Sequence, residues 1–187
     1  KTFKESVDSK WNDWQNNYDK VKVTFWKMVN DLKLTEENAE RISRYAYIQQ
    51  RGGKEKLLND TGYTEKDLEI DLTPQEMSVY KFMVEEMKAI HPMLAESLKE
   101  NHNEVVGYVE NYFPMMTNFM ATKPVVEEIM GEFRMKRVPF GNIEERKDNA
   151  KQPLKMNAFE VFDTYMNKST YFIAMDKTLS DLNSIAG

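Results

Sequence analysis

The first 32 residues repeat apolar side chains every three or four positions. Those positions are Phe3, Val7, Trp11, Trp14, Tyr18, Val21, Phe25, Met28 and Leu32. The spacing matches the 3.6-residue period of an α-helix, so these side chains share one face. The segment therefore predicts an amphipathic helix of about eight turns. Its aromatic content favours packing in a globular core over a Leu/Ile zipper, and a coiled-coil arm is the alternative.

Helix-breaking residues are scarce in the whole chain. It has 7 Gly and 6 Pro among 187 residues, about 7% against a usual share of roughly 12%. A β-sandwich or barrel needs turn residues at much shorter intervals, so this composition argues against both. With 41% hydrophobic residues, the chain can bury a substantial core.

A second helix is predicted from the N-cap Thr35 to about Arg51, with Gly52 and Gly53 ending it. The short link through Lys33 and Leu34 predicts an antiparallel helical hairpin with the first helix, over residues 1–53. Residues 54–72 are expected to be irregular, apart from one short helix around 55–59.

Two further helices carry clear start signals. Thr73 can cap a helix, Pro74 suits its first position, and Glu76 completes a capping box. Pro92 lies inside the apolar stripe of this helix and predicts a kink or a break at His91. Asn157 caps a last long helix that runs to about residue 185. Another helix is expected over 124–135, followed by a polar, basic connection over 136–156.

These segments together predict an all-α, multi-helix bundle with a long N-terminal amphipathic helical hairpin. We expect one helical domain over residues 1–187. It has a possible subdivision into the hairpin, 1–53, and a helical bundle, 73–187.

Composition and spacing argue against the common catalytic and metal sites. The chain has no Cys, which excludes disulfides, thiolate zinc sites and Cys nucleophiles. A di-iron bundle needs Glu three residues before His, but Lys88 and Lys99 stand before the two His residues, His91 and His102. The acidic pair Glu85-Glu86 is interpreted as solvated helix surface. We therefore expect no catalytic residue, metal or cofactor.

Aromatic and basic residues are the candidates for an interaction site. The aromatic candidates are Trp11, Trp14, Tyr108, Tyr112 and Phe113, and core packing is the competing interpretation for all of them.

The basic candidates lie in residues 134–155, which carry a net charge of 7 − 3 = +4. They are Arg134, Lys136 and Arg137. This region could contact phosphate groups of a nucleic acid, or attract the acidic segment 60–100 of the same chain or of its neighbours. The whole chain has a net charge of −5, which gives no general attraction to nucleic acid or to anionic lipid.

The order of four segments in residues 73–185 is similar to that in a known class of proteins. The capped helix from Thr73 is followed by the segment 107–114 (GYVENYFP), the basic segment 133–137 (FRMKR), and the capped helix from Asn157 with Tyr165 and Tyr171. Over residues 73–185 this order resembles helical regions of large phage and prophage proteins of the virion-associated or polyvalent kind. The resemblance implies a non-catalytic segment of a long phage or mobile-element protein, in the bacterial cytoplasm or the virion.

The sequence thus predicts a structural or protein-interaction domain, whose partners are other proteins, other domains of one polypeptide or a second copy. It has no apolar run long enough to cross a membrane. A first residue other than Met is consistent with a fragment of a larger protein or a removed leader. Two alternatives remain open: a nucleic-acid-associated module that uses residues 134–155, and an accessory domain of an enzyme whose active site lies elsewhere.

Overall fold

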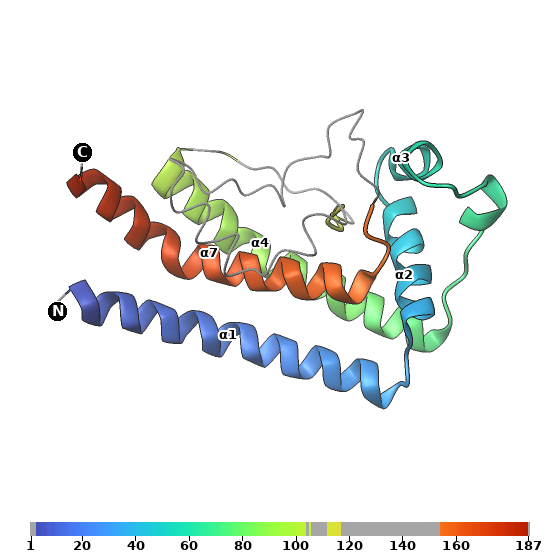
Figure 1. The fold of residues 1–187 in the computed structure, drawn as a ribbon, viewed down its shortest axis with the longest axis horizontal. Coiled ribbons are helices and arrows are strands. Elements are labelled where there is room, and N and C mark those ends of the chain that lie inside the picture. The colour runs from blue at the N-terminus through green and yellow to red at the C-terminus, as the bar shows by residue number, and fades with distance from the viewer. Residues whose placement is uncertain (1–2, 104, 106–111, 117–153, 187) are drawn as a thin grey trace.

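The computed structural model describes residues 3–103, 105, 112–116 and 154–186. Their helices are α1 (Phe3–Asp31), α2 (Glu36–Ile48), α3 (Gly53–Asp60), the 3₁₀ helix η1 (Glu65–Leu68), α4 (Pro74–His102) and α7 (Ala158–Ala186) (Figure 1). The described residues form helices and no β-strand, which confirms the predicted all-α, multi-helix fold. The long N-terminal helix is also confirmed.

Three helices of 29 residues each form the long body of the molecule. Helix α7 packs against both α1 and α4 and is the principal partner of each. It runs antiparallel to α1, so the C-terminal end of α7 lies beside the N-terminal end of α1 (Figure 1). Helix α4 runs in the same direction as α7. The bundle is therefore built around its last helix.

The position of α2 differs from the predicted hairpin. Helix α2 follows α1 after a short turn, in which Lys33 has a left-handed φ of 53°, but it lies across the end of α1 instead of alongside it (Figure 1). Its buried residues are Ala39, Ile42, Ser43, Ala46 and Tyr47. They are accommodated because α2 packs on α3, α4 and α7. The apolar stripe of α1 packs against α7 and not against the buried residues of α2.

The predicted helix starts are confirmed. Thr35 is the N-cap of α2. The Thr73 hydroxyl accepts a hydrogen bond from the Glu76 N–H at the start of α4. The Asn157 side chain accepts from two N–H groups in the first turn of α7. Each cap satisfies backbone donors that the first turn of a helix leaves without partners.

The helix breakers differ from the prediction at Gly52 and, in part, at Pro92. Helix α4 continues through Pro92, so the predicted break does not occur there; the helix ends at His102, and its C-cap Asn103 is left-handed with a φ of 54°. Helix α2 ends at Ile48, three residues earlier than expected. Gly52, with a φ of 71°, is the N-cap of α3 rather than the end of α2. The helix predicted over 124–135 lies outside the described residues.

The centre of the core is aromatic. Phe25 of α1 is fully buried. Its ring centroid lies 4.7 Å from that of Phe162, 5.8 Å from that of Phe159 and 6.3 Å from that of Phe82. One side chain thus joins α1 to both α7 and α4. Burial of this much aromatic surface is the dominant favourable contribution at the junction of the three helices.

A buried carboxylate joins α2 to the start of α4. Glu76 has no exposed surface, and its oxygens accept hydrogen bonds from the Asn38 amide (2.9 Å), the Arg41 Nε (3.0 Å) and the Thr73 N–H (2.8 Å). Burial, the largest effect, would raise its pKa, but these three donors outweigh it and lower the pKa below the ordinary 4.5.

We expect Glu76→Gln to lower the free energy of unfolding at neutral pH by about 1–3 kcal/mol, because it leaves the Arg41 charge without its carboxylate. The folded-state pKa of Glu76 is depressed, so its contribution is complete above pH 4.5 and is lost as the pH falls below that value. The difference between wild type and variant should therefore shrink in acid. Urea unfolding across this pH range measures it, with the exposed Glu85→Gln as control. A difference that does not change with pH would contradict the assignment.

Candidate functional site

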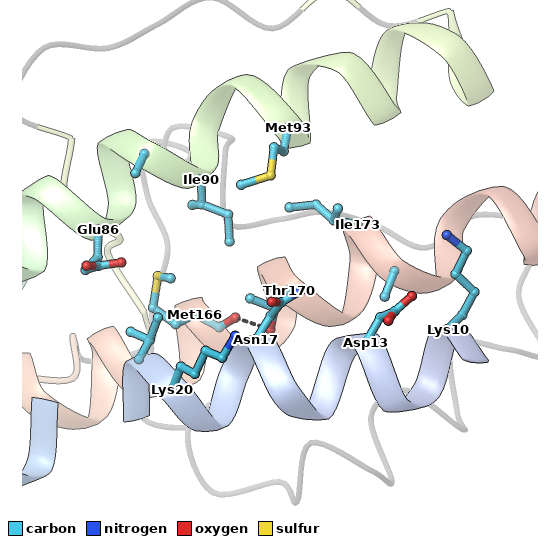
Figure 2. A pocket seen from close by; sticks show the side chains of 13 residues that line it. Lys10, Asp13, Asn17, Lys20, Glu86, Ile90, Met93, Met166, Thr170 and Ile173 are labelled. Carbon is cyan, nitrogen blue, oxygen red and sulfur yellow. Dashed lines mark hydrogen bonds between the residues drawn. The ribbon is translucent and has the colours of Figure 1, made fainter. Parts of the chain in front are cut away.

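A groove lies between α1 and α4, with α7 forming its floor (Figure 2). It encloses about 470 Å³. Its lining comes from three helices: Lys10, Asp13, Asn17, Lys20 and Val21 of α1, Glu86, Ala89, Ile90 and Met93 of α4, and Met166, Thr170, Ile173 and Ala174 of α7. The volume is in the range of binding sites in proteins.

The position of the groove follows from how the three helices meet. Helices α1 and α4 approach each other at the Phe25–Phe82 ring contact. Beyond it, toward the N-terminal end of α1 and the C-terminal end of α4, both helices stay on α7 but leave the space between them open (Figure 2). The groove therefore extends along α1 from Lys10 to Val21, with α4 on its other side.

The floor of the groove is apolar. Met166 of α7 is buried and Ile173 of α7 is half-buried, and Ile90 on the α4 side of the groove is also buried. Thr170 also belongs to the floor, but its hydroxyl donates to the Met166 carbonyl oxygen at 2.7 Å, so its donor is used within α7. Met93 stands at the edge with 49% of its surface exposed. Unbranched, polarizable Met side chains adapt to different apolar partners.

The two rims of the groove are polar and differ in charge. The α1 rim carries Lys10, Asp13 and Lys20, with the neutral Asn17 between them, and the α4 rim carries Glu86. Because α1 and α4 run antiparallel, Glu86 lies at the same end of the groove as Lys20, and Lys10 lies at the other end (Figure 2).

Glu86 is half-buried, whereas its neighbour Glu85 is exposed. Burial, and then the nearby charge of Glu85, raise the pKa of Glu86 above its ordinary value. The ionised carboxylate at this rim is therefore less well stabilised than in water.

The predicted aromatic pair Trp11 and Trp14 lies where α1 meets α7, outside the groove lining. The Trp14 ring lies 5.4 Å from Tyr171 and is stacked on Tyr18 at 6.4 Å, and its indole N–H donates to the Asn167 carbonyl oxygen at 3.3 Å. Trp11 contacts Trp14 and Tyr171 edge-on but is 41% exposed. Trp14 is thus a packing residue, and Trp11 remains accessible.

Of the second group of predicted aromatic residues, Tyr108, Tyr112 and Phe113, the structure describes the last two. Phe113 is fully buried, and the Gln50 side chain donates to its carbonyl oxygen at 2.9 Å. Tyr112 is half-buried beside Tyr165 at 6.1 Å between ring centroids. Phe113 therefore belongs to the core, and the partly buried Tyr112 packs against it. The remaining predicted residues, Tyr108, Arg134, Lys136 and Arg137, lie outside the described residues.

Another polar cluster joins α4 to α7 away from the groove. Asp176 is 3% exposed and accepts hydrogen bonds from the Ser97 hydroxyl and the Asn101 amide, both at 2.8 Å. Such satisfied buried groups hold helices in register. In the part of the chain that the structure describes, no three His, Asp or Glu side chains are placed to hold a metal ion together.

Comparison with known proteins assigns no relative. The chain matches no protein-family model, no curated protein and no solved structure. None of the described helices combines the length and the apolar character needed to span a membrane.

Sequence reasoning missed most of the groove. Val21, Ile90, Met166 and Ile173 belong to apolar stripes of the predicted helices, whereas the polar α1 residues lie outside the stripe of that helix. A signal was present, because Lys10, Asp13, Asn17 and Lys20 recur at spacings of three and four and form a second face of α1 beside the stripe. This spacing alone does not predict which helix lies opposite that face.

We expect Trp14→Ala to destabilise the protein by about 2–4 kcal/mol and Trp11→Ala by about 1 kcal/mol or less, because the more exposed ring has less surface to lose. Thermal and chemical unfolding measure both values. Equal losses would contradict the division into one packing and one accessible tryptophan.

Proposed function

We propose that the chain is a non-catalytic protein-interaction domain, and that its groove binds an amphipathic helix. That helix belongs to a partner protein or to another domain of the same polypeptide. Its apolar face would lie on α7, between α1 and α4, in the helix-in-groove mode of recognition.

The length and lining of the groove carry this proposal. The α1 rim extends from Lys10 to Lys20, about 15 Å at 1.5 Å per residue, which is nearly three helical turns. The floor is apolar and the rims are polar, as at interfaces with a hydrophobic core and a wet edge. A helix lying there would complete a four-helix arrangement and cover the exposed side of Met93.

The resemblance to helical regions of large phage and prophage proteins supports the same role. Such long polypeptides contain many neighbouring domains, and a groove that accepts a helix provides a means of joining one domain to the next. On this proposal the domain acts in assembly within a phage or mobile-element protein.

The probe for this proposal is a designed helical peptide. It has one stripe of Leu and Ala and neutral polar residues elsewhere. With methyl-labelled methionine, we expect its addition to shift the NMR signals of Met93 and Met166 in the groove. Those of Met28 and Met77, outside its lining, should stay unchanged. We expect micromolar affinity, because a short peptide loses conformational freedom when it is held as a helix in the groove.

The variant Met93→Glu should weaken this binding by about tenfold, because it places a charge against the apolar face of the peptide. Val23→Glu is the matched control, since Val23 is also an exposed apolar residue on a helix and lies outside the groove lining. Equal effects of both variants, or shifts spread over all methionines, would reject the groove as the binding site.

A further inference from the structure

We propose that the helix bound in the groove carries opposite charges on its two edges, with a basic side chain toward Glu86 and an acidic side chain toward the lysines of α1. This inference rests on the proposed function and names the chemistry of its partner.

The charge at the α4 rim favours a cation on the bound helix. Among the described residues, Glu86 forms no ion pair, although it is half-buried and faces the groove (Figure 2). A carboxylate held partly out of water gains more from a nearby positive charge than an exposed one does. Its raised pKa has the same physical origin, burial followed by the charge of Glu85. A Lys or Arg on the bound helix would supply that charge.

The charge at the α1 rim favours an anion on the bound helix. Lys10 and Lys20 flank Asp13, so the rim has a net charge of 2 − 1 = +1. Lys20 lies opposite Glu86, and no ion pair joins them across the groove within the described residues (Figure 2). The two rims thus present opposite charges on either side of an apolar floor. A helix between them can satisfy both only if its own edges differ in charge.

Three designed peptides test this inference. They share the Leu/Ala stripe of the neutral probe and differ only in their edges: one edge Lys and one Glu, both edges Lys, or both edges Glu. Wild type should bind the mixed peptide about fivefold more tightly than either of the others, since each unmatched edge loses about 1 kcal/mol. The order of the two edges should not matter, because a helix can lie in the groove in either direction.

Charge reversal at the α4 rim should change this preference. Glu86→Lys makes both rims basic, so the variant should bind the peptide with two Glu edges most tightly. Glu86→Gln should remove the discrimination between the mixed peptide and the peptide with two Glu edges. Glu96→Lys is the matched control, because it makes the same change at an exposed position of α4 that lies outside the groove lining. Circular dichroism and thermal unfolding establish that each variant is folded.

The outcomes separate the two proposals. If neither the neutral probe nor any of the charged peptides binds, the proposed function is overturned. If all peptides bind wild type equally, or Glu96→Lys alters the preference as much as Glu86→Lys does, the groove still binds a helix but the charge pattern is overturned. The expected preference should also weaken as salt rises from 50 to 500 mM, because rim charges are screened.

Discussion

The fold depends on the burial of α7 between α1 and α4. The N-terminal half of this helix is apolar on several sides, with Ala158, Phe159, Val161, Phe162, Tyr165 and Met166 all buried. A helix of this kind is stable only when other elements cover most of its surface. Phe25 and Phe82 cover the same region from α1 and α4. The long body of the molecule follows from this central position.

Polar contacts decide how α7 is rotated about its axis. Tyr18 of α1 donates to the Asp163 carboxylate at 2.6 Å, and Trp14 donates to the Asn167 carbonyl oxygen. On the other flank, Ser97 and Asn101 of α4 donate to Asp176. Directional hydrogen bonds on two flanks hold the rotation more narrowly than apolar packing alone. In this orientation Met166, Thr170 and Ile173 line the groove.

Local sequence signals predicted the helices well because helix ends depend on neighbouring residues. The caps at Thr35, Thr73 and Asn157 need only a side-chain acceptor and the next few N–H groups. Pro92 was harder to interpret. Its clash and its missing N–H argue for an interruption, yet α4 continues through it. The packing of α4 on α7 along its length offsets that local cost, and no local pattern contains this information.

The order of the residues was sufficient to predict an all-α fold, the long first helix and an apolar stripe along it, since all three depend on periodicity. It was not sufficient to predict that α2 lies across the end of α1, or that the stripe of α1 faces α7, more than 120 residues away in sequence. Nor did it reveal the groove, whose lining combines polar positions of α1 with Glu86 and Met93 of α4 and the floor of α7. A groove of this kind exists only after three helices separated in sequence have packed, because its shape depends on the angle and rotation of each helix.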